Sequence, residues 1–186
     1  MLTAHQIIEG YLQGVFPMAE PDDDNTIYWY QPTKRGVILP EEFHVPKNLK
    51  KEYQKQAFEL KIDCDFTATI KACSEREETW ISDEIMDAYI GLHQMGFAHS
   101  FEAWQNKQLV GGLYGVRIGK IFFGESMFHR VTNASKIVLV YLMEWVAKEN
   151  IQLVDCQFIT DHLKQFGAKE IPQKQYLTLL KKAIAQ

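Results

Sequence analysis

Three strongly apolar segments follow one another between residues 98 and 128 with almost no chain between them. They read AHSFEAWQ, QLVGGLYGVRIG and KIFFGESMF, and the pairs Asn106-Lys107 and Gly119-Lys120 stand at their junctions. Such short polar or glycine-containing junctions are typical of tight hairpin turns. The sequence therefore predicts an antiparallel three-stranded meander, which limits the chain to folds built on a sheet.

The segments around this meander predict an α+β domain with a mixed sheet flanked by helices. Residues 134–149 form a strongly periodic helix, and IQLVDCQF after it reads as a buried strand. Further helices are expected at 3–13, 46–56, 66–73, 82–95 and 171–184, with strands at 36–40 and 58–63. A short helix capped by Asp161 is expected to end at Gly167. This order is similar to the GNAT acyltransferase fold, an analogy that names no substrate.

Composition bounds the class of protein. The 186 residues, 46% of them hydrophobic, suit one compact domain with a small appendage. We place a boundary near Pro32, which gives a small N-terminal subdomain at 1–32 and a main domain at 33–186. No apolar run of 18 residues and no signal-peptide pattern is present, so we expect neither a transmembrane helix nor a signal peptide. Three cysteines without CxxC spacing favour a reducing cytoplasm over a disulfide framework, and with six scattered histidines they do not favour a metal site.

The stretch FFGESMFHR places a carboxylate and a hydroxyl among apolar residues. This pattern is found both in a buried site and in an edge strand with one solvent-exposed face. A hydrolase nucleophile elbow requires G-x-S-x-G between a strand and a helix. Ser126 has only Gly124 before it, and the strand continues past it. The following HRVTNASK contains no glycine, so the loop that would bind a coenzyme A pyrophosphate is missing. Both a serine hydrolase and a coenzyme A-dependent enzyme are therefore disfavoured.

A second polar group lies in VDCQF, where Asp155 and Gln157 are two residues apart in a strand. This spacing predicts that both project from one face, with Val154, Cys156 and Phe158 in the core. A carboxylate beside a carboxamide is able to accept a proton and orient a polar substrate. The alternative, a strand end whose polar face is simply wet, remains open from spacing alone.

Seven segments together resemble the leucyl/phenylalanyl-tRNA–protein transferase family in order and spacing: GYLQGVFPM, TWIS, HSFEAW, LVGGLYGV, GESMFHRVTNASK, VDCQF and FGAKEIPQKQYL. The resemblance implies a small N-terminal domain followed by a GNAT-like domain. It implies transfer of leucine or phenylalanine, with methionine a further candidate, from aminoacyl-tRNA to protein N-termini that begin with arginine or lysine. Such transfer marks the acceptor for N-end rule degradation and needs no metal or coenzyme. We expect a monomer without a membrane association.

The resemblance also assigns site residues. It implies a polar catalytic cluster of Glu125, Asp155 and Gln157, in which Asp155 helps to deprotonate the attacking amine and Gln157 steadies the oxyanion. Glu125 is expected to hold an amino group of the donor or of the acceptor. The remaining implied contacts are Tyr11, Trp80 and Tyr89 at the terminal adenosine, Leu113, Phe122 and Met127 around the transferred side chain, and Gly124 for close backbone approach. A bulge near Gly124 is needed for Phe122, Glu125 and Met127 to reach one pocket.

Three features depart from the family pattern. Met18 replaces a common tryptophan, Thr160 replaces an asparagine, and the usual leader containing LGGDL has no counterpart before Met1. Leu142 and Val146 stand where phenylalanines occur, so side-chain preference is expected to differ.

The net charge of −4 does not favour nucleic-acid binding. A local basic face of Lys34, Arg35, Lys47, Lys50 and Lys51 is expected to contact the tRNA backbone, although such runs are commonly only solvated. Two other functions remain open: a GNAT-type N-acetyltransferase and a non-catalytic module that binds basic N-termini.

Overall fold

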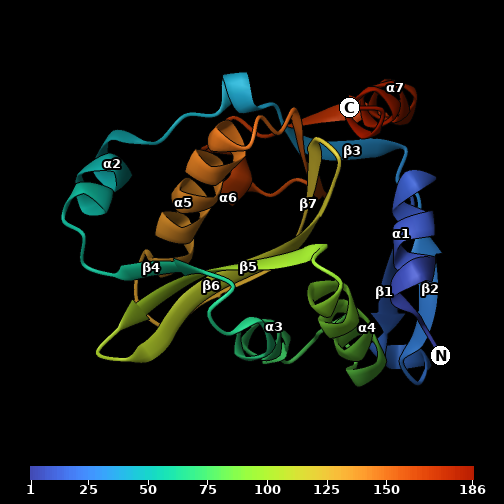
Figure 1. Cartoon of the computed structure of the whole chain (residues 1–186), viewed down its shortest axis with the longest axis horizontal. Coiled ribbons are helices and arrows are strands. Elements are labelled where there is room, and N and C mark those ends of the chain that lie inside the picture. Colours follow the sequence, from blue (N-terminus) through green and yellow to red (C-terminus); the bar gives the residue numbers. More distant parts are fainter.

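The computed structural model describes all residues, 1–186, as an α+β arrangement of two sheets and seven α-helices (Figure 1). The helices are α1 (Ala4–Leu12), α2 (Lys47–Gln54), α3 (Phe66–Ser74), α4 (Asp83–Gln94), α5 (Ala134–Lys148), α6 (Asp161–Lys164) and α7 (Gln173–Ile184). The strands are β1 (Phe16–Glu20), β2 (Thr26–Tyr30), β3 (Lys34–Ile38), β4 (Glu59–Ile62), β5 (Ala98–Gln105), β6 (Gln108–Ile118), β7 (Ile121–His129), β8 (Leu153–Gln157) and β9 (Lys169–Pro172).

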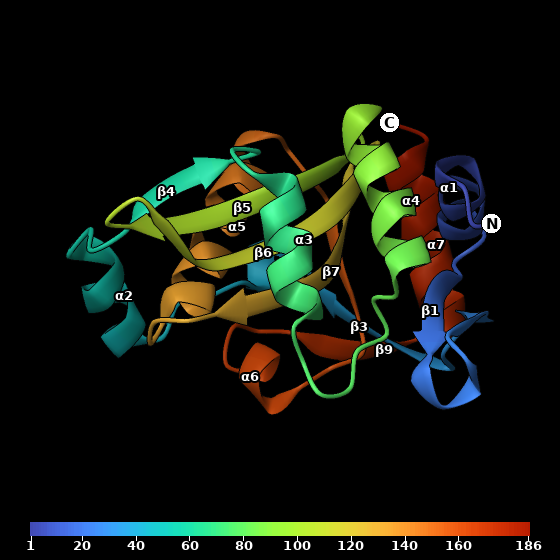
Figure 2. The same ribbon diagram turned by 90° about the horizontal axis from the view of Figure 1, so that it is seen from below.

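The main sheet has seven strands in the order β4-β5-β6-β7-β8-β3-β9, and β1 and β2 form a separate hairpin. Only β7 and β8 pair in parallel, because α5 carries the chain from one to the other. The sheet is therefore mixed, and the predicted fold class is confirmed. Helices α3 and α4 cover one face of it and α5 covers the other (Figures 1 and 2).

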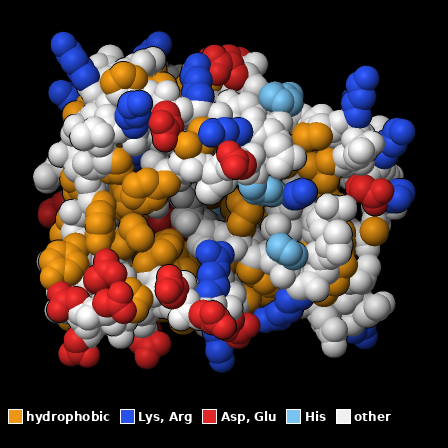
Figure 3. Space-filling model, turned by 180° about the vertical axis from the view of Figure 1, so that it is seen from behind, with side chains coloured by type: hydrophobic (Ala, Val, Ile, Leu, Met, Phe, Trp, Pro, Cys, Tyr) orange, Lys and Arg blue, Asp and Glu red, His pale blue; other side chains and the backbone are white.

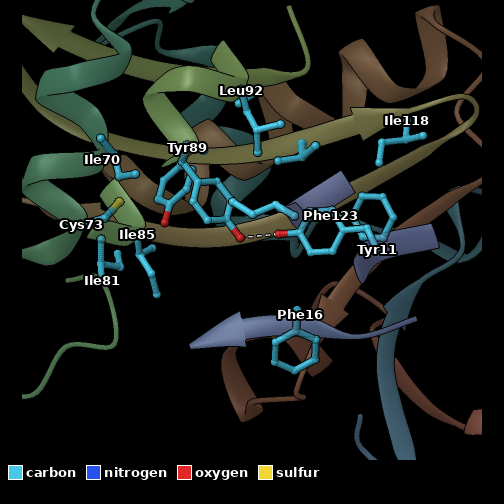
Figure 4. Close-up of a cluster of buried hydrophobic side chains, with 14 of the residues drawn as sticks. Tyr11, Phe16, Ile70, Cys73, Ile81, Ile85, Tyr89, Leu92, Ile118 and Phe123 are labelled. Carbon is cyan, nitrogen blue, oxygen red and sulfur yellow. Dashed lines mark hydrogen bonds between the residues drawn. The ribbon is translucent and has the colours of Figure 1, made fainter. Parts of the chain in front are cut away.

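Each face of the sheet carries its own apolar core. One core lies under α3 and α4 and includes Ile7, Tyr11 and Phe16 from the N-terminal segment (Figure 4). The other lies under α5 and includes Phe101, Phe122 and most inward residues of that helix. The N-terminal segment thus completes a core to which the main sheet contributes, rather than forming a separate one.

Local sequence signals explain most element boundaries. Thr3 and Gln6 form the expected capping box of α1, and Asn106 and Lys107 both adopt the positive φ that a tight hairpin turn requires. Thr160, not the predicted Asp161, caps α6, because its hydroxyl accepts a hydrogen bond from the Leu163 N–H. Strands β1 and β9 were not predicted, since prolines at positions 17 and 172 disfavour strand patterns in a sequence.

Candidate active site where β7 and β8 diverge

The most informative feature of the sheet is the short pairing between β7 and β8. Only residues 121–123 pair with 153–155, and beyond these the strands separate. A cavity of about 300 Å³ opens at this divergence, and it is lined from both faces of the sheet. Figure 3 looks onto its side of the molecule, where the surface is hollowed beside a patch of apolar side chains rimmed by acidic ones.

Glu125 is the extra residue of a β-bulge in β7. Tyr114 pairs with Ser126 and Gly115 pairs with Gly124, so Glu125 has no partner on β6. The predicted bulge near Gly124 is therefore confirmed. The bulge turns the Glu125 carboxylate into the cavity, where Tyr11 Oη donates to Oε1 and Gln157 Nε2 donates to Oε2 at 3.1 Å.

The environment of this carboxylate disfavours its charged form. Burial raises the pKa of Glu125 to about 7, although hydrogen bonds from Tyr11 and Gln157 act in the opposite direction and favour the anion. Glu125 therefore gains and loses its proton near neutral pH. A group whose pKa is displaced in this way, at the wall of a cavity, is typical of a functional site.

Gln157 reaches Glu125 because β8 ends with an unusual backbone conformation. The φ of Gln157 is 61°, in the left-handed region, and this breaks the alternation of faces along the strand. The prediction that Asp155 and Gln157 share a face is therefore wrong: Gln157 lines the cavity and Asp155 does not. Phe158 also lies outside the expected core, since it is 48% exposed.

Asp155 is fully buried behind the cavity and accepts four hydrogen bonds. Arg35 Nε and Nη2 donate at 3.0 and 2.7 Å, Tyr176 Oη donates at 2.6 Å, and the backbone N–H of Gln157 donates at 2.8 Å. With these acceptor sites occupied, the expected direct proton transfer to Asp155 has no geometric basis. The bond to the Gln157 N–H instead holds the turn from which the Gln157 carboxamide reaches the cavity.

Arg35 does not belong to the expected basic face. It is only 2% exposed, and beyond its bidentate pair with Asp155 it donates to the Gly14 carbonyl at 2.8 Å. Its guanidinium also lies over the Phe16 and Tyr176 rings, at 4.7 and 4.4 Å from their centroids. The prediction that it contacts tRNA phosphates is therefore wrong, because a buried carboxylate requires this cation as its partner.

The apolar half of the cavity lies on the α5 side. Leu113 and Met127, which are cross-strand partners, line it as predicted, together with Leu142. Phe122 does not line the cavity, because its side chain is fully buried against the Phe101 and Trp145 rings. The sequence reasoning missed several further lining residues, among them Ile38, Arg76, Tyr114, Leu139, His162 and Leu163. Leu139 could have been found, since it precedes Leu142 by one helical turn.

Tyr11 and Tyr89 are fully buried and support Glu125 rather than lining the cavity. Their hydroxyls bond to one another, and the Tyr11 ring stacks on Phe123 with centroids 4.4 Å apart (Figure 4). Their faces are therefore closed to an adenine, contrary to the predicted adenosine contact. Trp80, Met18, Gly124 and Thr160 do line the cavity, as expected for substrate contacts.

Basic side chains gather in two places. Lys34 and the three lysines of α2, at positions 47, 50 and 51, are exposed, but none lines the cavity. A second cleft of about 470 Å³ adjoins the cavity through their shared residues Arg76, Met127 and His162. It adds His129, Arg130, Ser135 and Glu75, and the Glu75 carboxylate pairs with Arg130 at 3.1 Å. The neighbouring cleft therefore carries two guanidinium groups, one of them ion-paired, which the sequence reasoning did not predict.

Two absences complete the description of the site. The structure contains no group of three or more His, Cys, Asp or Glu side chains that could hold a metal ion. None of the seven helices combines the length and apolar character needed to span a bilayer.

The fold and the site define an α+β protein with a half-apolar cavity whose inner end carries one carboxylate and one carboxamide. Comparison with known proteins is in agreement with this class. Residues 37–181 match the family model described as leucyl/phenylalanyl-tRNA protein transferase, and residues 1–33 match the model of its N-terminal domain. The chain belongs to the leucyl/phenylalanyl-tRNA protein transferase family, and the predicted resemblance is confirmed.

Curated relatives are similar over nearly the whole chain. A leucyl/phenylalanyl-tRNA–protein transferase of Herpetosiphon aurantiacus is 50% identical over 98% of this chain and 95% of its own length. One of Paramagnetospirillum magneticum is 45% identical over 100% of this chain and 90% of its length. A third, from Nitrobacter winogradskyi, is 44% identical over 98% of this chain and 83% of its own length.

Proposed function

We propose that this protein transfers leucine or phenylalanine from aminoacyl-tRNA to the N-terminal amine of proteins that begin with arginine or lysine. The observation that carries the proposal is the Glu125–Gln157 pair at the inner end of an apolar cavity, in a chain of this family. We place the reaction in the cytoplasm, as the tagging step of N-end rule degradation, with a monomeric enzyme, and assign it no cofactor. Residues 1–32 act as a small N-terminal subdomain and 33–186 as the catalytic domain.

The apolar half of the cavity takes the transferred side chain. Its walls are Leu113, Met127 and Leu142, and the volume of the whole cavity, about 300 Å³, suits one leucyl or phenylalanyl group with its ester. Burying such a side chain contributes about 1.5–3 kcal/mol, which is enough to select apolar over polar aminoacyl groups.

The polar half orients the reacting groups. The ionised Glu125 carboxylate binds the α-amino group of the aminoacyl moiety, and Gln157 Nε2 donates to the ester carbonyl as it becomes an oxyanion. One such donor typically contributes about 2.7–4 kcal/mol in a transition state. The acceptor amine attacks the carbonyl carbon, the bond to the ribose oxygen breaks, and that oxygen takes up the proton that the amine releases.

No strong base is required for this step. An α-amine has a pKa of about 7.7–8.0, so a sizeable fraction is already neutral at physiological pH. The aminoacyl ester is itself activated, and holding two reactants in line is worth several kcal/mol. We therefore propose that positioning supplies most of the rate, with Asp155 acting through the backbone of Gln157.

The tRNA 3′ end fits the two adjoining clefts. Trp80 lines the cavity and offers a ring for the terminal adenine, while Arg76 and Arg130 of the neighbouring cleft offer guanidinium groups to the nearest phosphates. Lys34, Lys47, Lys50 and Lys51 remain exposed candidates for more distant backbone contacts. Affinity for tRNA should then fall steeply with added salt.

The test incubates the protein with labelled Phe-tRNA and a peptide that begins with arginine. We expect label on this peptide and none on a matched peptide that begins with alanine, and Gln157→Ala should lose most of the transfer. An acetyl-CoA reaction in parallel distinguishes the acetyltransferase alternative. Absence of transfer by the wild-type protein, or acetyl transfer in its place, would overturn the proposal.

A further inference from the structure

Tyr114 carries a buried hydroxyl that has no hydrogen-bond partner. The side chain is fully buried, and its Oη is one of only two buried side-chain polar atoms left unpartnered in the molecule, the other being His162 Nε2. Leaving a buried hydroxyl unpaired destabilises a fold. Tyr114 is also one of the residues that line the cavity.

The ring of Tyr114 is held in a fixed position. It packs edge-on against Tyr89 and Phe66, with centroids 5.7 and 5.8 Å away. Tyr114 pairs with Ser126 across the sheet, directly beside the bulge that carries Glu125. The two polar groups therefore stand next to one another on the same side of the divergence between β7 and β8.

Unlike the neighbouring tyrosines, Tyr114 has a hydroxyl without a hydrogen-bond partner. Tyr11 Oη donates to Glu125 and bonds to Tyr89 Oη, so both of those hydroxyls are satisfied within the protein. Arg76 approaches the same wall, but its guanidinium donates to Ser126 Oγ and to the Met127 carbonyl. None of these groups supplies a partner for Tyr114.

We propose that Tyr114 is a substrate-contacting residue, whose hydroxyl oxygen accepts a hydrogen bond from the α-amino group of the aminoacyl moiety. This rests on the proposed function, in which Glu125 binds that group. An ammonium has three N–H donors, whereas the bonds from Tyr11 and Gln157 leave Glu125 about two of its four acceptor sites, so a second acceptor group is needed. The α-amino group and the side chain of the aminoacyl moiety are attached to one Cα, so the two groups are bound close together. Leu113 and Tyr114 are adjacent residues, of which the first lines the apolar half of the cavity and the second the polar half.

The experiment compares the wild type with Tyr114→Phe, which removes only the hydroxyl. Two stable amide-linked adenosines serve as competitive inhibitors of transfer: one carries phenylalanine, and the other carries 3-phenylpropionate, which lacks the amine. We expect Tyr114→Phe to raise the inhibition constant of the first by about tenfold or more. The second should change by less than about twofold, because a neutral Phe ring preserves the shape of the wall.

Stability provides the control for folding. Tyr114→Phe should unfold at an equal or higher urea concentration than the wild type, since no internal hydrogen bond is lost. Tyr89→Phe, the matched control, removes a bonded hydroxyl and should unfold earlier.

Equal weakening of both inhibitors, or no change in either, would overturn the role of Tyr114. Failure of the wild-type protein to transfer phenylalanine would instead count against the proposed function, so the two failures are distinguishable.

Discussion

Replacing Glu125 by glutamine should change how stability depends on pH. Burial holds the pKa of this carboxyl at about 7, against 4.5 for an ordinary glutamate. Between these two values the folded state keeps a proton that the unfolded state has lost, so stability falls as pH rises through this window. At 1.36 kcal/mol per pKa unit the full loss is about 3 kcal/mol. Partial exposure of Glu125 reduces it to about 2 kcal/mol.

The assay is urea unfolding at pH 5, 6, 7 and 8, followed by tryptophan fluorescence. Glu125→Gln should gain about 2 kcal/mol relative to wild type on going from pH 5 to pH 8, because glutamine cannot ionise. Glu59→Gln, at a carboxylate that is 69% exposed, is the control and should follow the wild-type profile. Parallel profiles for wild type and Glu125→Gln would show that the carboxyl is not desolvated and would refute the reasoning.

Four further substitutions test the surroundings of the site. Arg35→Ala should lower the free energy of unfolding by about 3–5 kcal/mol, because it leaves Asp155 buried and unpaired; a loss below about 1 kcal/mol in urea unfolding would contradict this. Gly115→Ala should cost about 3 kcal/mol, since its Cβ would lie 2.3 Å from the Phe123 carbonyl oxygen. Gly124→Ala, whose Cβ meets nothing closer than 3.5 Å, should unfold almost as the wild type does. Leu142→Phe narrows the cavity and should shift the kcat/KM ratio towards leucine, measured with Leu-tRNA and Phe-tRNA; an unchanged ratio would remove Leu142 from the side-chain pocket.

The meander and the helix after it could be predicted because their signals are local. Turn residues at 106–107 need only their own backbone geometry, and the periodic apolar residues of 134–148 need only one helix face. Strand β9 could not be predicted, because its hydrogen bonds depend on β3, which is distant in sequence. Strand β1 pairs with the nearby β2, so its omission has a local cause. Proline in each strand hides the pattern further.

The site was predictable in its residue types and less so in its geometry. The bulge near Gly124 was expected because the family resemblance required Glu125 and Met127 to reach one pocket, whereas the positive φ of Gln157 has no signal in the sequence. Arg35 was misplaced because Lys34-Arg35-Gly36 reads as a charged surface segment. The available clue was Asp155 in an otherwise apolar strand, since a carboxylate in that position requires a buried cation.

Single-turnover transfer of phenylalanine from labelled Phe-tRNA to an arginine-initiated peptide tests the central claim most directly. The comparison is between Glu125→Gln, Gln157→Ala and Glu59→Gln, each first shown to be folded by urea unfolding. The two cavity variants should transfer at least about 100-fold more slowly than wild type, as expected when a charged anchor or an oxyanion donor is lost. The surface variant should transfer at the wild-type rate. Rates for Glu125→Gln and Gln157→Ala that remain close to wild type would contradict the claim that this pair holds the aminoacyl ester for attack.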